Sequence, residues 1–333
     1  MKSLTDDTGV LQHTKYSIPD RKEGYTTDDN ARALIACIKF LQLHHNDSDV
    51  SKLVNTYLSF LFQMQKPDGK FHNLLSYSRV FLDDVGSEEC MAQSLWACGY
   101  AISTSSLKGV KHIAKEIFDK GLQHASSLKS PRAKAFTILG LCFYHEAFPD
   151  DRNPLKNIVP LTDQLLHNYQ QASSPDWPWF EPYLTYANAR LSQALFRAYD
   201  VIGDERYLQT AREAFDFLVR VQVIDNNFVP IGNKGWYKKG GKRALYDQQP
   251  IEASCMVEAA LAAFRVTGDE KYQRIAHIAF SWFLGKNSQD VMVYNPKTGS
   301  CYDGITPKGV NLNQGAEATV SYLLARLELN ASK

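Results

Sequence analysis

Eight carboxylates stand where the sequence predicts that buried helices begin. The first two, Asp28 and Asp29, follow Thr26 and Thr27, either of which can act as an N-cap, and negative charge is favoured in a first helical turn. The run 33–41 that follows is almost uncharged, which is typical of a buried helix. Paired carboxyl groups suit general acid–base chemistry. The others are Glu88, Glu89, Glu181, Asp247, Glu252 and Glu317.

Each of these acids has a simpler interpretation when it is considered alone. A carboxylate at a helix start can satisfy backbone N–H groups, or it can form an ion pair with Arg32, Arg132 or Arg190. The recurrence of the same layout along the chain favours a functional pocket for the set.

Aromatic and amide side chains occupy the same loops as the carboxylates. Aromatic rings can stack on the apolar faces of sugars, although in loops they can equally pack as plugs. Amide groups can hydrogen-bond to hydroxyls, or they can cap turns. We expect Trp179 and Trp236 to be the main ligand-stacking residues. The remaining predicted binding residues are Arg32, Trp177, Tyr186, Asn188, Arg190, Asp247, Gln248, Asn313 and Glu317.

The elements that must position these residues are helices of two alternating kinds. Apolar helices are predicted over 33–41, 90–101, 133–145, 183–199, 252–264 and 317–327, and amphipathic helices over 50–65, 108–126, 153–169, 205–221 and 270–283. Val201–Tyr207 also recurs as Val266–Tyr272. Helix pairs that cannot bury their own apolar faces must stack on one another.

The alternation predicts an all-α fold with buried helices inside and amphipathic helices outside, an (α/α)6 toroid formed by a single domain over 1–333. A twelfth helix would then be missing, irregular or supplied by the N-terminal segment. All inner helices would start on one face, together with the long loops. A superhelical repeat array is the alternative, and it predicts more uniform repeats than these.

Composition excludes several classes of partner. The 333 residues carry a formal charge of +1, so neither nucleic acid nor a membrane is expected as a partner. The six cysteines lack metal-ligand spacing and fit a reducing, cytoplasmic compartment. No signal peptide or membrane span is predicted, although the chain could be cut from a longer one. Neither HExxH, a CxxC pair nor a P-loop is present, so no metal and no cofactor is expected.

The alternating hairpins, Pro67-Asp68-Gly69 and the run Phe280–Asn287 resemble the six-hairpin glycosidase superfamily, over nearly the whole chain. The stretches 24–34, 177–190 and 311–319 further resemble an uncharacterised bacterial domain found alone or appended to sugar-nucleotide glycosyltransferases. The superfamily includes hydrolases, lyases, epimerases and phosphorylases. No histidine begins an inner helix, which counts against the histidine-based sugar epimerases of this fold.

This resemblance implies a carbohydrate-active enzyme, and we expect an inverting glycoside hydrolase that acts on a short oligosaccharide. Such an enzyme needs two carboxyl groups. We expect Asp29 and Glu181 to form this acid/base pair, with Asp28, Glu88 and Glu252 as substitutes. A lyase using tyrosine and arginine is a lesser expectation. The opposing hypothesis is a non-catalytic sugar-binding or scaffold domain that assists a glycosyltransferase.

Overall fold

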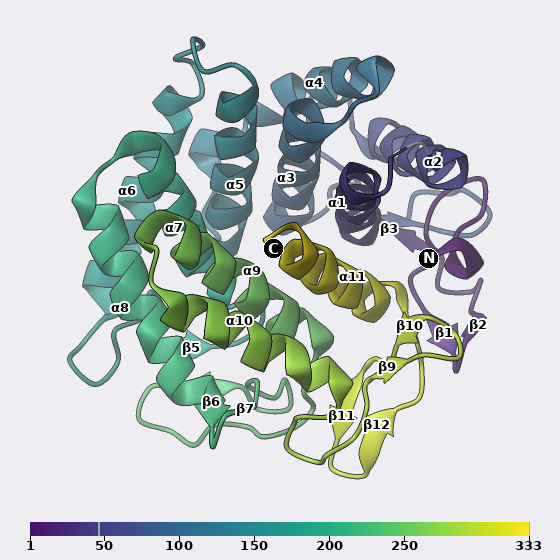
Figure 1. The fold of residues 1–333 in the computed structure, drawn as a ribbon. Helices are drawn as coiled ribbons and strands as arrows, with labels where there is room; N and C mark the ends of the chain where they lie inside the picture. The colour runs from purple at the N-terminus through teal and green to yellow at the C-terminus, as the bar shows by residue number, and fades with distance from the viewer. Residues whose placement is uncertain (46, 333) are drawn as a thin grey trace. The chain divides into compact units, whose positions relative to one another are not determined.

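The computed structural model describes residues 1–45 and 47–332 of the chain. These residues form two compact units, Met1–Thr162 and Asp163–Lys333, called unit 1 and unit 2 below. Figure 1 shows that both units are built almost entirely of helices. Because the chain divides into these two units, the single domain over 1–333 stays a prediction.

Unit 1 contains five complete α-helices and the start of a sixth. Each buried helix follows a loop and is followed by a more exposed helix. Their bounds are α1 Thr27–Leu43, α2 Ser48–Met64, α3 Glu88–Thr104, α4 Lys108–Leu122 and α5 Pro131–Ala147, and α6 Leu155–Ala172 continues into unit 2.

Unit 2 continues the same alternation. Its helices are α7 Ala189–Ile202, α8 Glu205–Gln222, α9 Pro250–Thr267, α10 Glu270–Ser281 and α11 Ala316–Ala331. Three short 3-10 turns are η1 Lys2–Leu4, η2 Ala125–Ser127 and η3 Trp282–Leu284.

The strands of the described residues are two or three residues long and pair only as antiparallel two-stranded ladders in the loops. The pairs are β1 Thr14–Lys15 with β2 Ile18–Pro19, β3 Tyr25–Thr26 with β4 Leu74–Leu75, β5 Tyr183–Leu184 with β8 Tyr237–Lys238, β6 Val223–Ile224 with β7 Asn227–Phe228, β9 Tyr294–Asn295 with β10 Ser300–Cys301, and β11 Gly304–Thr306 with β12 Gly309–Asn311.

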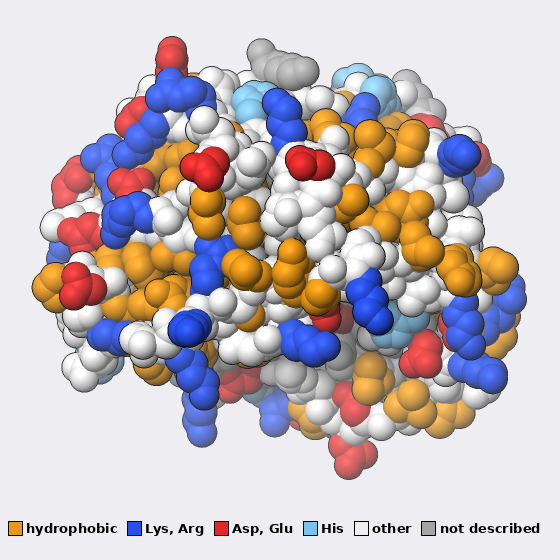
Figure 2. Space-filling model, turned by 90° about the horizontal axis from the view of Figure 1, so that it is seen from below, with side chains coloured by type: hydrophobic (Ala, Val, Ile, Leu, Met, Phe, Trp, Pro, Cys, Tyr) orange, Lys and Arg blue, Asp and Glu red, His pale blue; other side chains and the backbone are white. Residues whose placement is uncertain are grey.

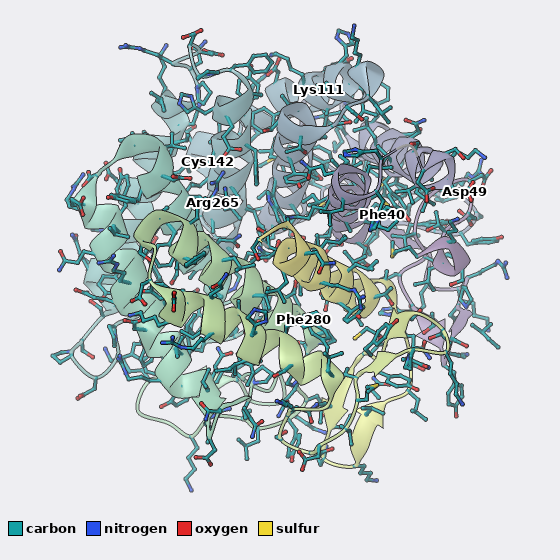
Figure 3. All side chains as sticks on the ribbon, in the orientation of Figure 1. Phe40, Asp49, Lys111, Cys142, Arg265 and Phe280 are labelled. Carbon is teal, nitrogen blue, oxygen red and sulfur yellow. The ribbon has the colours of Figure 1, made fainter. Side chains whose placement is uncertain are left out.

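Burial separates the helices into the two kinds predicted from the sequence. In unit 1, α3 buries 13 of its 17 residues and α4 only five of 15. In unit 2, α9 buries 14 of 18 and α10 only four of 12. The buried helices pack on one another within each unit, α1 on α3 on α5 and α7 on α9 on α11. The more exposed helices carry side chains such as that of Asp49 on α2, which is 56% exposed (Figure 3).

Two glycines allow α3 and α5 to approach at backbone distance. A Cβ added to Gly99 would lie 2.1 Å from the carbonyl oxygen of Gly140, and one added to Gly140 would lie 2.6 Å from that of Leu95. The pairs Trp96–Phe136 and Tyr100–Phe143 pack on either side of this contact. The two helices therefore run parallel with one fixed register.

The start predicted for the fourth apolar helix is wrong. The sequence predicts a helix from Tyr183, but Tyr183 and Leu184 pair with β8, and the helix begins at Ala189. Asn188 holds the turn between this strand and the helix, because its side chain accepts a hydrogen bond from the Thr185 N–H and donates one to the Thr185 carbonyl. Ala187 takes a left-handed φ of 48° at the same turn.

The N-terminal segment supplies no α-helix among the described residues. Residues 1–26 form η1, the β1–β2 hairpin and β3, and they pack against α1 and α2. Val10 donates its N–H to the Oδ1 of Asn30, and the hydroxyls of Thr5 and Tyr57 lie 2.7 Å apart. The missing outer helix of the predicted toroid is therefore not found here.

All six cysteines are buried and outside any disulfide, so we expect their thiols to react slowly in the folded protein. Burial raises the pKa of the Cys37 thiol to about 12, and it also raises the pKa of Cys98. Because the thiolate is the reactive form, a disulfide reagent at neutral pH should titrate six thiols only after unfolding in guanidinium. A thiol that reacts within seconds in the native protein would contradict this.

Candidate functional site

The first turn of α1 holds two consecutive aspartates in different environments. Asp29 is 3% exposed, and its Oδ1 lies 2.7 Å from Nη2 of Arg32. The Thr26 hydroxyl donates to Oδ2 of Asp29 and accepts from the Asp29 N–H, so Thr26 is the N-cap. Arg32, which the sequence predicts to bind a ligand, thus forms an ion pair with Asp29.

Asp28 is half-buried beside this ion pair. Its Oδ1 accepts the Asp29 N–H at 3.0 Å, and no other described residue hydrogen-bonds to its carboxylate. The charge of Asp28 adds to burial in raising the pKa of the Cys90 thiol on α3. Of the two aspartates, Asp28 is therefore the one with a carboxylate oxygen available to a ligand.

Glu88 and Glu89 connect the start of α3 to the start of α5. Oε2 of Glu88 accepts the N–H groups of Lys129 and Ser130 at 2.8 and 2.7 Å. Oε1 of Glu89 accepts the Ser130 hydroxyl, which in turn caps α5. These contacts give both glutamates a structural role in unit 1, and Glu88 also has a second oxygen outside them.

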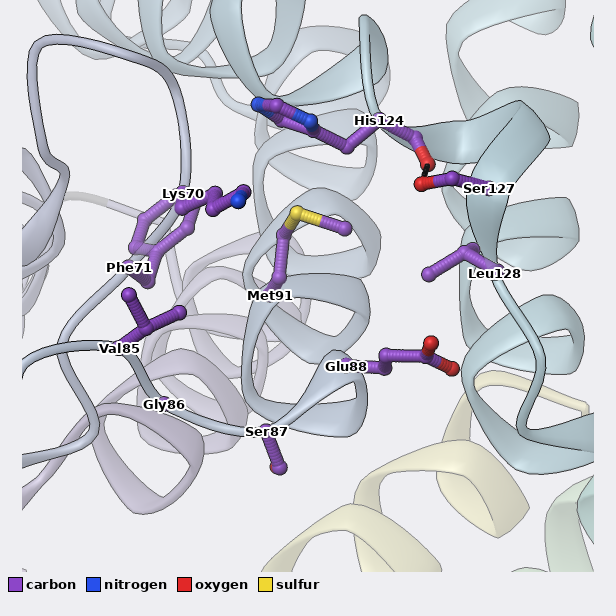
Figure 4. Close-up of a pocket in the computed structure, with 10 residues that line it drawn as sticks. All are labelled: Lys70, Phe71, Val85, Gly86, Ser87, Glu88, Met91, His124, Ser127 and Leu128. Carbon is purple, nitrogen blue, oxygen red and sulfur yellow. Dashed lines mark hydrogen bonds between the residues drawn. The ribbon is translucent and has the colours of Figure 1, made fainter.

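A pocket of about 240 Å³ opens beside Glu88 in unit 1 (Figure 4). The Met91 thioether lies in its middle, between the Lys70 and His124 side chains and the Glu88 carboxylate. One ring nitrogen of His124 is engaged in a hydrogen bond, because Nε2 lies 2.7 Å from the Asp68 carbonyl oxygen. The pocket is lined by Lys70, Phe71, Val85, Gly86, Ser87, Glu88, Met91, His124, Ser127 and Leu128.

Lys134, in the second turn of α5, is a buried cation that the sequence did not single out. It is 7% exposed, and burial lowers the pKa of its amine, while the nearby charge of Glu88 opposes that shift. Its ammonium group forms no hydrogen bond or ion pair with any described residue. A lysine within an apolar helix is the signal that would have identified it.

In unit 2, the tryptophans of the loop before α7 belong to the core. Trp177 is 3% exposed and packs edge-on against Phe217 and Tyr237, while Trp179 has no exposed surface. The Trp177 indole donates to the carbonyl of Glu181, whose side chain is also buried. Trp179 therefore offers no ring face to a ligand in this structure.

Tyr186 and Trp236 form the aromatic pair that does reach the surface of unit 2. Their ring centroids lie 6.1 Å apart, and Tyr186 is 38% exposed. Trp236 has a φ of 57°, which is unusual for a residue with a side chain, and the Gly232 carbonyl and the Ala244 N–H bond to its backbone. Half-buried Asp247 closes the same loop, because its carbonyl accepts the Asn233 N–H.

Glu252 lies in the first turn of α9 and is 3% exposed. Its Oε2 accepts a hydrogen bond from the Asn188 amide at 2.9 Å, so the two predicted site residues meet at the starts of α7 and α9. Arg190 lies deeper, with 2% exposure, and bonds to Glu258 and Gln193. These partners leave Arg190 facing the interior of unit 2.

Three other predicted residues lie around the loops of unit 2. Gln248 is fully buried, and its amide bonds to the Leu245 carbonyl, the Ser288 hydroxyl and the Trp282 indole. It therefore fixes the loops rather than facing a ligand. Asn313 and Glu317 are half-buried near the start of α11.

The structure thus brings together two groups of predicted residues, one in each unit. Sequence reasoning missed Glu258 and the pocket residue Met91; a glutamate in the middle of an apolar helix was the available signal for the first. Among the described residues, no group of three or more His, Cys, Asp or Glu side chains could hold a metal ion. Helices long and apolar enough to cross a bilayer are likewise not found in the described part.

Comparison with known proteins shows similarity at the level of structure. No family model and no curated sequence matches the chain. A sugar epimerase from a ruminal bacterium superposes with a TM-score of 0.76 and 12% identity, over 99% of this chain and 94% of that one. A GH76 α-mannanase from Bacteroides thetaiotaomicron gives 0.70 and 13%, over 98% and 91%.

A third match is an inactive variant of an α-1,6-mannanase from a Salegentibacter species, with two consecutive aspartates replaced by alanine and α-1,6-mannotetrose bound. It gives a TM-score of 0.67 and 11% identity, over 99% of this chain and 95% of that chain. At these identities the similarity concerns the fold alone. The chain therefore has the all-α (α/α)6-toroid fold that the alternating helices predict, shared with enzymes that act on sugars.

Proposed function

We propose that the protein is a carbohydrate-active enzyme, a glycoside hydrolase that uses carboxylates at the starts of its buried helices. The observation that carries the proposal is the Asp28–Asp29 pair, in which one carboxylate is fixed by Arg32 and Thr26 and its neighbour keeps an available oxygen. The fold shared with sugar epimerases and mannanases supports the substrate class.

The position of this pair separates it from the other consecutive aspartates of the chain. Asp6–Asp7, Asp83–Asp84 and Asp150–Asp151 lie in loops, whereas Asp28–Asp29 lies in the first turn of a buried helix. The α-1,6-mannanase variant that is inactive lacks two consecutive aspartates. By analogy, the pair in this chain is the first place to look for catalysis.

The proposed roles follow from burial and bonding. Asp28 contacts the substrate, and the Asp29–Arg32 ion pair holds the helix start in place and orients it. Glu181 remains the proposed second carboxyl, with Glu252 as its substitute. One carboxyl protonates the leaving oxygen while the other activates water or attacks the anomeric carbon. The predicted inverting mechanism requires the first product to have the opposite anomeric configuration.

The test is a hydrolysis screen on mannose-, glucose- and uronate-containing oligosaccharides, read by reducing ends and by NMR of the first anomer formed. We expect Asp28→Asn and Glu181→Gln each to lower kcat by about a hundredfold or more, because each removes a proton-transfer or nucleophilic group. Asp150→Asn, at the exposed first position of another consecutive pair, is the matched control and should keep full activity.

Activity that survives both substitutions would refute the assignment. Retention of the starting anomer would refute inversion while keeping the hydrolase. For Asp29→Asn, thermal unfolding is measured first, because that change also leaves Arg32 without its carboxylate. Epimerised products without cleavage would instead favour an epimerase, although no histidine lies in the first turns of the six buried helices described.

The second candidate is a non-catalytic sugar-binding or scaffold domain that works with a glycosyltransferase. The observation that favours it is that several candidate acids, among them Asp29, Glu88 and Glu252, are already bonded to other protein groups. Its signature is sugar binding without turnover of any oligosaccharide, together with a raised transferase rate when a glycosyltransferase is supplied. Cleavage of an oligosaccharide by the protein alone would exclude it.

A further inference from the structure

One loop of unit 2 carries a concentrated positive charge. Residues 226–246 contain five cationic side chains and no acidic one, so the remainder of this nearly neutral chain has a formal charge of −4. The five are Lys234, Lys238, Lys239, Lys242 and Arg243. A local excess of positive charge of this size attracts ligands that carry negative charge.

None of these cations is neutralised by a carboxylate in the described part of the chain. Lys239 donates to the Ala172 carbonyl, and Arg243 donates to the carbonyls of Val221 and Val229. The side chains of Lys234, Lys238 and Lys242 are exposed, and their ammonium groups form no hydrogen bond or ion pair with any described residue. Three ammonium groups are therefore available in solution.

The same loop carries Trp236, one ring of the aromatic pair at the surface of unit 2. Trp236 stands two residues from Lys234 and two from Lys238, and its ring lies 6.1 Å from that of Tyr186. Lys238 lies opposite Tyr183, 39% exposed, in the β5–β8 ladder. Figure 2 shows a face of the molecule on which lysine and arginine side chains stand among hydrophobic ones.

The loop is also fixed in place beside the carboxylates of unit 2. A Cβ on Gly232 would lie 2.1 Å from the Tyr246 carbonyl oxygen, and the N–H groups of Asn233 and Lys234 bond to the carbonyls of Asp247 and Tyr246. Asp247 then leads directly into α9, which carries Glu252. The cations are thus held in the segment that leads through Asp247 into α9 and Glu252, two of the candidate site residues.

We propose that this loop binds an anionic saccharide, with Trp236 and Tyr186 stacking on a sugar ring and Lys234, Lys238 and Lys242 pairing with its carboxylate or phosphate groups. The inference deepens the proposed function, on which it rests only for the sugar nature of the ligand. Anionic groups explain the lysines, because a neutral glycan needs no unpaired ammonium beside its stacking rings. The three lysines also offset the repulsion between an acidic sugar and the Asp247 carboxylate.

The test compares binding of four probes by calorimetry at low and at physiological salt. Tetragalacturonate supplies carboxylates, mannose 6-phosphate supplies phosphate, α-1,6-mannotetraose is neutral, and a single-stranded oligonucleotide tests the nucleic-acid alternative. The variant is the triple change Lys234→Gln, Lys238→Gln and Lys242→Gln. Its matched control changes three exposed lysines outside this loop that form no ion pair with a described carboxylate, Lys108→Gln, Lys156→Gln and Lys286→Gln.

We expect an acidic probe to bind more tightly than mannotetraose and to lose about tenfold in affinity in the loop triple variant, with little change in the control. Added salt should weaken that binding, because exposed charges are screened. Trp236→Ala should weaken every sugar probe, whereas Trp236→Phe should restore much of the loss. Which acidic probe binds identifies carboxylate or phosphate as the recognised group.

Equal affinity for neutral and acidic sugars, or equal losses in both triple variants, would overturn the inference and leave the hydrolase intact. Loop-dependent binding of tetragalacturonate without its cleavage would support the inference and count against a hydrolase that acts on that sugar, whereas mannose 6-phosphate, which has no glycosidic bond, reports binding alone. Tighter, loop-dependent binding of the oligonucleotide would overturn the saccharide assignment.

Discussion

Glu258→Leu is expected to destabilise the protein by about 3–5 kcal/mol, because it removes the Glu258 carboxylate from the buried Arg190 guanidinium. Both side chains are 2% exposed, and they link α7 to α9 across 68 residues of sequence. Gln193 also accepts from Arg190, but an amide does not neutralise the charge. The measurement is the free energy of unfolding from urea titration.

Two further variants make this result specific. Arg190→Met combined with Glu258→Leu should recover most of the loss, because replacing both partners of a buried pair by apolar groups of similar size is often neutral. Glu270→Gln, at the exposed start of α10, should change the unfolding free energy by no more than about 0.5 kcal/mol. If Glu258→Leu behaves like Glu270→Gln, the pair does not hold these helices together.

The second large effect concerns the backbone contact between α3 and α5. Gly99→Ala is expected to destabilise by about 3 kcal/mol, because its methyl group would lie 2.1 Å from the Gly140 carbonyl oxygen and backbone cannot move aside as a side chain can. The helices must separate, which also disturbs the Trp96–Phe136 packing. Thermal and urea unfolding measure the loss.

Gly109→Ala is the matched control for this change. Gly109 lies near the start of α4, and a Cβ there would meet nothing within 4 Å. The same substitution should therefore stabilise, by about 0.5–1 kcal/mol, because alanine loses less backbone entropy in a helix. A Gly99→Ala variant as stable as the wild type would show that α3 and α5 are not in this contact.

The sequence alone determined the features that depend on neighbouring residues. The alternation of buried and amphipathic helices follows from residue periodicity, and the structure confirms it in α3 and α4 and in α9 and α10. Thr26 caps α1 as one of the two predicted threonines, because the bond from its side chain to Asp29 spans three residues. Local hydrogen bonds and helical spacing need no knowledge of the fold.

Tertiary structure decided the features that depend on distant residues. Periodicity could not show that Trp179 would be fully buried while Trp236 reaches the surface, because both lie in aromatic loops. The delayed start of α7 arises from the pairing of Tyr183 with Lys238, 55 positions away in the chain. The sequence marks Asp29 and Arg190 equally as site candidates, but only folding brings Glu258 to Arg190 and turns that charge inward.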